Sequence, residues 1–219
     1  QTLDAGQTET DTFTYTISDG RGGSASATLT ISVLGADDPT TIAGTLTGTV
    51  EEDAVATATG TLTATDPDVG TRGFIAQVGN PGTYGSFSID AAGVWTYSLS
   101  NAAANVQALP EGQSVTETFV VSADDGTTAS VTVTVNGDND APVVSSTSIN
   151  AVEEGAAVPL GLATPSDVDS GAALTITVTG LPAIGQIQLA DGTPVVNGAT
   201  LGAALGARGF RRWYERQLF

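Results

Sequence analysis

Clusters of carboxylates recur along this chain, and their chemistry is that of a binding site for a hard divalent cation. Calcium takes about six to eight oxygen ligands from carboxylates, carbonyls and water. Neighbouring carboxylates repel each other by about 1–4 kcal/mol at 4 Å, so a protein seldom gathers them without a cation. Histidine and cysteine are both absent, and oxygen ligands alone favour calcium or magnesium over zinc or copper. The clustered acids are Asp37, Asp38, Glu51, Glu52, Asp53, Asp66, Asp68, Asp124, Asp125, Asp138, Asp140, Glu153, Glu154, Asp167 and Asp169.

Paired carboxylates can also hydrolyse glycosidic bonds, and this is the strongest enzymatic alternative. An active site is normally single, whereas these pairs are repeated along the chain. The chain also contains no histidine, cysteine or lysine that could serve as a base or a nucleophile. We therefore do not expect an enzyme.

The clusters stand at the ends of a unit that the chain repeats. The segment Leu3–Phe13 returns as Leu109–Phe119, and each copy continues through an Asp-Gly turn into a threonine-rich strand. The Asp-x-Asp motif that begins at Asp66 recurs 101 residues later at Asp167. Units in series with acids at their junctions predict a long molecule that binds cations between neighbouring units.

The net charge excludes two classes of partner. The chain has 219 residues with 24 acidic and 6 basic side chains, and its formal net charge is −18. Such a surface repels nucleic acid and anionic lipid headgroups, and no apolar run is long enough to span a membrane. Because there is no cysteine, a secreted form would need a stabilising link other than a disulfide, and a bound metal is the obvious candidate.

Alternation of apolar and polar residues predicts half-buried β-strands along most of the chain. The only predicted helix is a turn or two over Asn101–Ala108, capped by Asn101. A unit of about 100 residues with about seven short strands has the length of an immunoglobulin-like sandwich. The predicted fold class is therefore all-β, with antiparallel β-sandwich modules in series. Four aromatic residues on one predicted hairpin would form either core or a platform for stacking sugars: Tyr84, Phe87, Trp95 and Tyr97.

The closing part of the second unit resembles the last strands and linker of a cadherin-type repeat, in the segment Phe119–Pro142 (FVVSADDGTTASVTVTVNGDNDAP). Its earlier part is more similar to the VCBS-type repeat of very large bacterial surface adhesins of the RTX class. That similarity lies in Gly60–Gly70 (GTLTATDPDVG) and Gly82–Tyr97 (GTYGSFSIDAAGVWTY). The resemblance covers nearly all of residues 1–145, is looser over 146–200, and implies an immunoglobulin-like, cadherin-like fold.

The resemblance implies that the acids hold calcium at two junctions. At the first junction the implied ligands are Asp37, Asp38, Asp66, Asp68 and either Asp124 or Asp125. At the second junction they are Glu51 or Glu52, Glu111, Asp138, Asn139, Asp140, Asp167 and Asp169. The first linker lacks the Asn-Asp pair of the family, and Leu-Pro-Glu at the second junction lacks one carboxylate. Fewer ions per junction are therefore expected than a cadherin-type junction holds.

The repeat divides the chain into four parts. Residues 1–37 are expected to be the closing strands of a truncated repeat, residues 38–140 a complete repeat, and residues 141–205 a partial one. Residues 206–219 depart from the pattern and hold four of the six arginines. This tail is expected either to be a disordered or non-native end or to form a short basic helix that binds a membrane or a partner.

The resemblance also implies a function outside the cell. The chain would be a calcium-stiffened extender repeat of a bacterial surface adhesin, exported by type I secretion and supporting cell adhesion and biofilm attachment. Its partners would be neighbouring repeats of the same chain and, through other domains, a cell-surface glycan or protein. Two alternatives remain open: a sandwich that binds polysaccharide or protein directly, and a passive spacer that binds no metal.

Overall fold

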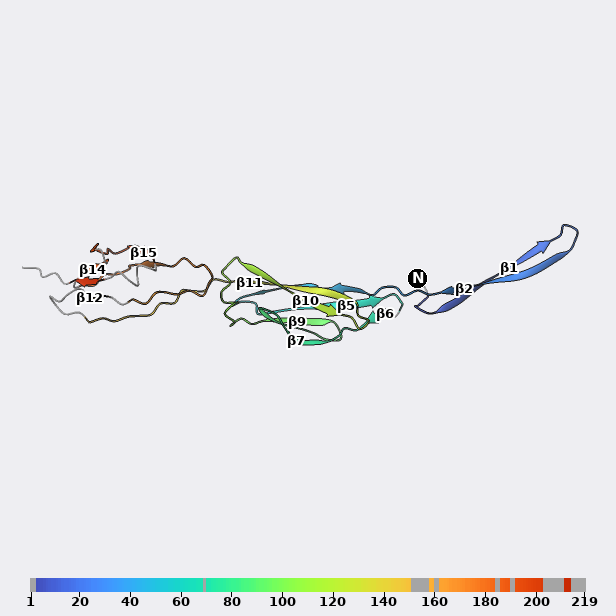
Figure 1. Ribbon diagram of the computed structural model, residues 1–219, viewed down its shortest axis with the longest axis horizontal. Helices are drawn as coiled ribbons and strands as arrows, with labels where there is room; N and C mark the ends of the chain where they lie inside the picture. The colour runs from blue at the N-terminus through green and yellow to red at the C-terminus, as the bar shows by residue number, and fades with distance from the viewer. Residues whose placement is uncertain are drawn as a thin grey trace, which may run out of the picture. The chain divides into compact units, whose positions relative to one another are not determined.

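The computed structural model describes residues 3–68, 70–150, 158–159, 162–183, 186–189, 192–202 and 211–213. These residues form strands, turns and irregular segments without a helix, so the predicted all-β fold class is confirmed (Figure 1). The chain divides into two compact units, which are described separately. The first comprises Gln1–Asn101 and Ser114–Asn136, and the second comprises Ala102–Gln113 and Gly137–Phe219.

A sandwich of two sheets forms the larger part of the first unit (Figure 1). The larger sheet has the order β3-β5-β9-β8-β7, with β6 paired to β5. Its strands are β3 (Thr41–Gly44), β5 (Thr57–Asp66), β6 (Gly70–Arg72), β7 (Gln77–Pro81), β8 (Gly85–Ile89) and β9 (Val94–Leu99). The smaller sheet has the order β10-β11-β4, in which β4 runs parallel to β11. Its strands are β4 (Thr47–Glu51), β10 (Ser114–Ser122) and β11 (Thr128–Asn136).

Aromatic side chains from both sheets meet in the core of the sandwich. Phe87 on β8 and Phe119 on β10 stack with their ring centroids 4.8 Å apart, and Tyr97 on β9 lies 5.8 Å from Phe119. Phe87, Trp95 and Tyr97 are all completely buried. The alternative in which these three aromatic residues form an exposed sugar-stacking platform is therefore wrong.

Trp95 fits into this core because the neighbouring strands present glycine to its ring. Gly60 on β5 lies opposite Trp95 in the strand register, and a Cβ atom at Gly60 would be 2.6 Å from the indole. A Cβ atom at Gly48 on β4 would be 2.8 Å from it. The indole Nε1 donates a hydrogen bond of 2.8 Å to the carbonyl of Thr45. The polar end of the ring is thus satisfied although the ring is buried.

Residues 101–108 form consecutive turns, so the predicted helix at Asn101–Ala108 is wrong. The intended cap, Asn101, is engaged with the loop that follows β4. Its amide donates a 2.5 Å hydrogen bond to Asp53 Oδ1, and its Oδ1 accepts a 3.0 Å hydrogen bond from the Asp53 backbone N–H. The residues that follow Asn101 form turns, so Asn101 has no helix to cap there.

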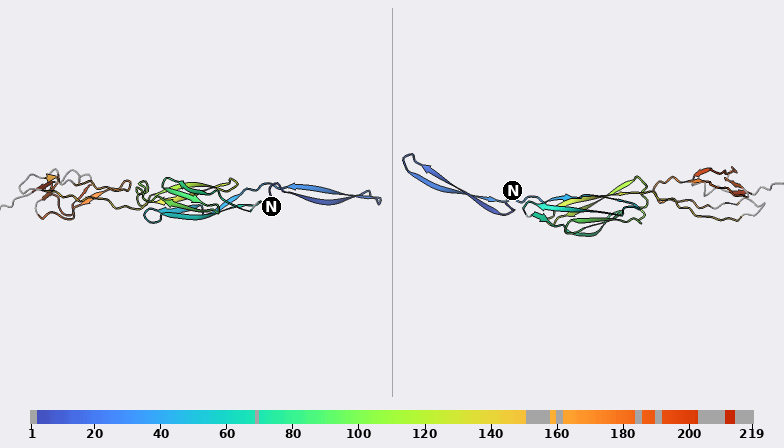
Figure 2. Two further views of the ribbon diagram at one scale, coloured as in Figure 1. Left: turned by 90° about the horizontal axis from the view of Figure 1, so that it is seen from below. Right: turned by 180° about the vertical axis from the view of Figure 1, so that it is seen from behind.

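Strands β1 (Thr8–Ser18) and β2 (Ser24–Leu34) form a separate antiparallel hairpin (Figures 1 and 2). Its register repeats that of β10 and β11, because Phe13 lies opposite Leu29 as Phe119 lies opposite Val131. Every residue of β1 and β2 is exposed, whereas half-buried strands were expected. No second sheet covers the hairpin within the described residues, so its apolar side chains stay in contact with solvent.

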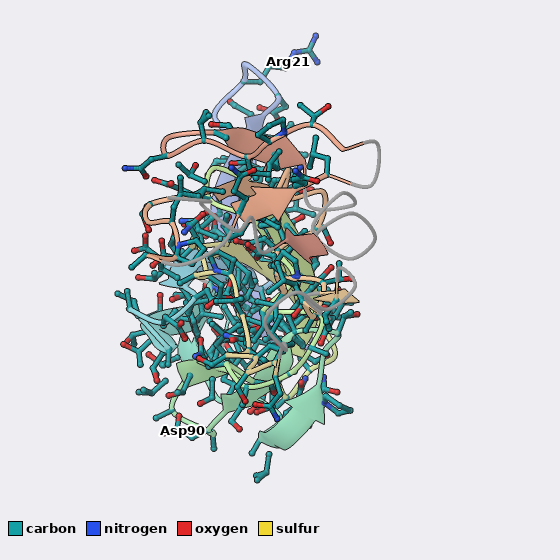
Figure 3. The ribbon with its side chains drawn as sticks, turned by 90° about the vertical axis from the view of Figure 1, so that its left-hand side faces the viewer. Arg21 and Asp90 are labelled. Carbon is teal, nitrogen blue, oxygen red and sulfur yellow. The ribbon has the colours of Figure 1, made fainter. Side chains whose placement is uncertain are left out.

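Aspartates form the turns of two hairpins, as the sequence predicts. Asp19 Oδ1 accepts hydrogen bonds from the N–H groups of Arg21 (2.8 Å) and Gly23 (2.9 Å), and these bonds lower the pKa of Asp19. Asp90 Oδ1 accepts two equivalent bonds of 2.9 Å in the β8–β9 turn. Figure 3 shows both turns, with the side chain of Arg21 extending outward. The third predicted turn includes Asp191, which lies outside the described residues.

The second unit contains short strands. β13 (Thr175–Thr177) pairs with β15 (Thr200–Gly202), and β16 (Arg211–Trp213) pairs with both β12 (Val158–Pro159) and β14 (Gln186–Gln188). Residues 211–213 of the basic tail are therefore a strand, and not part of an amphipathic helix. The rest of residues 206–219 lies outside the described residues, and the origin of the tail stays a prediction.

Candidate cation-binding sites

The first linker, residues 37–39, folds back on the Asp-x-Asp motif that begins at Asp66. The backbone N–H of Asp38 donates a hydrogen bond of 2.7 Å to Asp68 Oδ2. The N–H of Asp68 in turn donates a 2.8 Å bond to Asp66 Oδ1. These two bonds fix the linker at the end of β5, where Asp66 is the last residue.

The second linker, residues 138–142, makes the equivalent two hydrogen bonds with the motif that begins at Asp167. The N–H of Asp140 donates a 3.0 Å bond to Asp169 Oδ2, and the N–H of Asp169 donates a 3.0 Å bond to Asp167 Oδ1. All three residues belong to the second unit. The recurrence agrees with the 101-residue spacing of the two motifs in the sequence, and it gives the two linkers a common local structure.

Arg72 lies among the acids of the first linker. Its Nε and Nη2 atoms bind Asp66 Oδ2 at 3.1 and 2.8 Å. Its guanidinium also lies 3.8 Å from Asp124 Oδ1 and 3.8 Å from Asp125 Oδ2. Only 2% of the Asp66 side chain is exposed, so the charge of Asp66 is balanced within the protein. The hydrogen bond with Asp66 raises the pKa of Arg72.

Thr40 joins two of the same carboxylates. Its hydroxyl is 3.0 Å from Asp66 Oδ2 and also contacts Asp125 Oδ2. A hydroxyl has one hydrogen to donate, so the two carboxylates share it. The bond from Thr40 and a second bond from the N–H of Thr127 lower the pKa of Asp125. Asp125 is therefore ionised at neutral pH, where it contributes to this charged cluster.

Asp169 is a buried acid at the second linker. It is 8% exposed, and its Oδ1 is buried without a hydrogen-bond partner. A buried polar atom left in this way costs about 1–3 kcal/mol. The sequence contains no basic residue from position 73 to position 207. A cation from solution would satisfy this oxygen.

The structure does not assemble the complete set of predicted ligands. Within the described residues, no three acidic side chains come close enough together to hold a metal ion. The physical reason is that backbone N–H groups and Arg72 already bind several of the carboxylates. Glu52 is buried. The remaining predicted ligands are exposed: Asp37, Glu51, Glu111, Asp138 and Asn139. Their role as ligands stays a prediction.

The acids at the first linker and those at the second therefore differ in how well they suit calcium. The second offers only oxygen donors, one of them buried and unsatisfied, and calcium would complete its coordination with main-chain carbonyls and water. The first already contains the guanidinium of Arg72 beside its most buried acid. By the chemistry of their donors, the residues at the second linker suit the ion better than those at the first.

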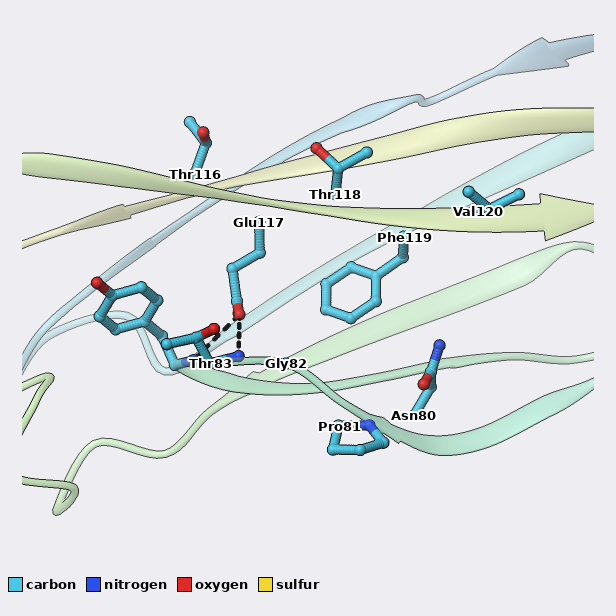
Figure 4. Close-up of a pocket in the computed structure, with 10 residues that line it drawn as sticks. Asn80, Pro81, Gly82, Thr83, Thr116, Glu117, Thr118, Phe119 and Val120 are labelled. Atoms are coloured by element: carbon cyan, nitrogen blue, oxygen red, sulfur yellow. Dashed lines mark hydrogen bonds between the residues drawn. The ribbon is translucent and has the colours of Figure 1, made fainter.

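Sequence reasoning missed Glu117, a buried acid on β10 that is 8% exposed. Its carboxylate accepts hydrogen bonds from the N–H groups of Thr83 and Tyr84 and a 2.5 Å bond from the hydroxyl of Tyr97. Figure 4 shows Glu117 reaching from β10 to the segment at Gly82 and Thr83. Burial and the bond to Glu117 both raise the pKa of Tyr97. The strand alternation could have identified Glu117, because it is in phase with the inward-facing Phe119.

Comparison with known families agrees with this architecture. Residues 36–137, which include the whole sandwich, match the family model of a bacterial cadherin-like domain. Residues 1–32, which include β1 and most of β2, match the family model of a bacterial Ig domain. The comparison with curated proteins found no match.

Both kinds of domain are typically extracellular, non-catalytic structural modules. The part of the chain that the structure describes contains no helix that is long and apolar enough to cross a bilayer. The two family matches support a coarse functional class, an extracellular repeat module.

Proposed function

We propose that this chain is an extender segment of a secreted bacterial surface adhesin of the VCBS and RTX type, stiffened by calcium at its second linker. The observation that carries the proposal is the buried Oδ1 of Asp169, which has no hydrogen-bond partner. It lies at a linker that is otherwise closed by the same backbone bonds as the first. The cadherin-like match over residues 36–137 supports the same function.

Asp169 would be the central ligand, with Asp140 and Asp167 beside it and Asp138 and Asn139 on the exposed side. A bound calcium ion would neutralise these acids. By coordinating both groups, it would hold the linker against the Asp-x-Asp motif. Asp169 already positions the linker by accepting the N–H of Asp140. Extracellular modules bind calcium with dissociation constants of about 0.1–1 mM. Calcium at tenfold excess over that constant would stabilise the bound form by about 1.4 kcal/mol.

The hairpin β1–β2 would be the closing part of a preceding sandwich in the same adhesin. Its register is that of β10–β11, and residues 1–32 match a bacterial Ig domain. Phe13 and Leu29 are 52% and 45% exposed here, whereas the equivalent Phe119 and Val131 are 5% and 0% exposed. A two-stranded hairpin is only marginally stable alone, so we propose a neighbouring repeat as its partner.

Calcium-dependent stiffening also suits export by type I secretion. Where calcium is scarce, the acids of the second linker repel one another and leave the joint loose. Outside the cell, millimolar calcium would occupy Asp169 and its neighbours and make the joint rigid. The adhesive contact itself, with a surface glycan or protein, would be made by other domains.

Thermal unfolding and small-angle scattering of the full chain test this function. In millimolar calcium, compared with chelator, we expect the melting temperature of the calcium-binding part to rise by roughly 6–11 °C for 1.4 kcal/mol. The maximum dimension should increase because the joint becomes rigid. Sodium chloride of equal ionic strength controls for screening of the net charge.

A metal-free passive spacer would show neither change in calcium, and that result would contradict the proposal. Specific binding of the isolated chain to a glycan array would instead favour the polysaccharide-binding alternative. The two measurements together separate an extender from both of its rivals.

A further inference from the structure

We propose that Arg72 is the built-in cation of the first linker cluster, so that this cluster is closed by the protein itself and takes no calcium. The proposal goes beyond the calcium-stiffened extender, because it does not require that the second linker bind metal. The acids at the first linker would be neutralised by an arginine of the protein, and those at the second by a bound calcium ion.

Arg72 is the last residue of the short strand β6, which pairs with the end of β5. In the β5–β6 pairing, Gly70 lies opposite Asp66 and Arg72 lies opposite Ala64. Gly70 has a φ of 90°, a left-handed conformation that glycine adopts without strain. The chain therefore turns within a few residues, and the side chain of Arg72 reaches the carboxylate of Asp66.

The guanidinium occupies the centre of the acidic group. It donates two hydrogen bonds to Asp66 Oδ2 and lies within 3.8 Å of oxygens of Asp124 and Asp125. The side chain of Arg72 is 26% exposed and that of Asp66 is 2% exposed. A divalent ion that bound these same oxygens would lie within a few ångströms of a permanent positive charge. Like charges at that distance repel strongly, so arginine and calcium exclude each other here.

The second linker provides an internal comparison. Its hydrogen bonds to Asp167 and Asp169 repeat those of the first linker. The residue six positions after Asp167 is Ala173, whereas the residue six positions after Asp66 is Arg72. In the second motif, Asp169 keeps a buried oxygen that has no hydrogen-bond partner. Arg72 binds Asp66, whose counterpart in the second motif is Asp167. An alanine at the position of Arg72 therefore leaves the second motif without the guanidinium that balances the first.

The variant Arg72→Ala in the full chain tests the proposal, with Arg21→Ala as its matched control. Arg21 carries the same charge on an exposed turn of the β1–β2 hairpin. In chelator, we expect Arg72→Ala to melt several degrees below wild type and Arg21→Ala to melt with wild type. In millimolar calcium, Arg72→Ala should recover much of this loss and bind an additional calcium ion by equilibrium dialysis. Arg72→Lys retains the charge and should bind no additional ion.

Two results would overturn the proposal. One is an Arg72→Ala protein that binds no more calcium than wild type and whose loss of melting temperature calcium does not restore. The other concerns wild type alone, and applies even if the variant fails to fold: calcium-dependent NMR shifts of the Thr40, Gly73 and Asp124 amides would show that an ion binds beside Arg72. A wild type that binds no calcium at all would contradict the calcium-stiffened extender and leave the effect of Arg72→Ala as the test of this inference.

Discussion

Replacing Trp95 with alanine is expected to lower the free energy of unfolding of the β-sandwich by about 3–5 kcal/mol. The ring is completely buried, lies 5.9 Å from the ring of Phe87, and is in contact with two glycines that leave no side chain to fill the space. The substitution also removes the hydrogen bond to the carbonyl of Thr45. Urea denaturation of the full chain, followed by far-ultraviolet circular dichroism, measures the change.

Val78→Ala is the control for that experiment. Val78 lies in the same sheet but is 92% exposed, so its truncation should change the free energy of unfolding by no more than about 0.5 kcal/mol. Equal effects of the two substitutions would mean that Trp95 does not lie in the core. That outcome would also revive the interpretation of the aromatic residues as a sugar-binding platform.

Glu117→Ala is expected to have the next largest effect, a loss of roughly 3 kcal/mol. Three donors lose their acceptor: the N–H groups of Thr83 and Tyr84 and the hydroxyl of Tyr97. The Tyr97 hydroxyl is buried, and a buried donor left unsatisfied costs about 1–3 kcal/mol. The N–H groups of Thr83 and Tyr84 are partly buried and add smaller losses. The same denaturation experiment applies.

Two milder variants separate hydrogen bonding from simple loss of volume at this site. Glu117→Gln keeps an oxygen for the backbone donors, and Tyr97→Phe removes only the hydroxyl, so each should cost about 1 kcal/mol. If Glu117→Ala were no more destabilising than Glu117→Gln, the carboxylate would not hold the segment at Gly82 and Thr83 in place.

Much of the fold could be predicted from the sequence, because period-two alternation directly reports which face of a strand is buried. It placed Phe87, Trp95 and Tyr97 on one face, and all three are buried. The repeat also located both linkers, since Asp38 and Asp140 make the same hydrogen bond to the second acid of their Asp-x-Asp motifs. Strand alternation and repeated motifs are both visible in a single sequence, so these features could be predicted.

The features that the sequence did not reveal depend on which polar side chains hydrogen-bond to each other in the folded chain. Asn101 has the sequence context of a helix cap, but Asp53, far away in the sequence, binds it instead. Arg72 looks like an ordinary surface charge until β6 brings it beside Asp66. Exposure of the β1–β2 hairpin was missed for a different reason. Alternation predicts a buried face but cannot show whether a second sheet covers it.

Calorimetric titration of calcium into the wild-type chain and into Asp169→Asn determines whether Asp169 holds the ion. We expect binding to wild type with a dissociation constant of about 0.1–1 mM and at least tenfold weaker binding to Asp169→Asn, a loss of about 1.4 kcal/mol. Asp11→Asn, which removes the same charge from the exposed hairpin, should bind as wild type does. The absence of a binding heat in wild type, or the same affinity in Asp169→Asn, would contradict calcium binding at Asp169.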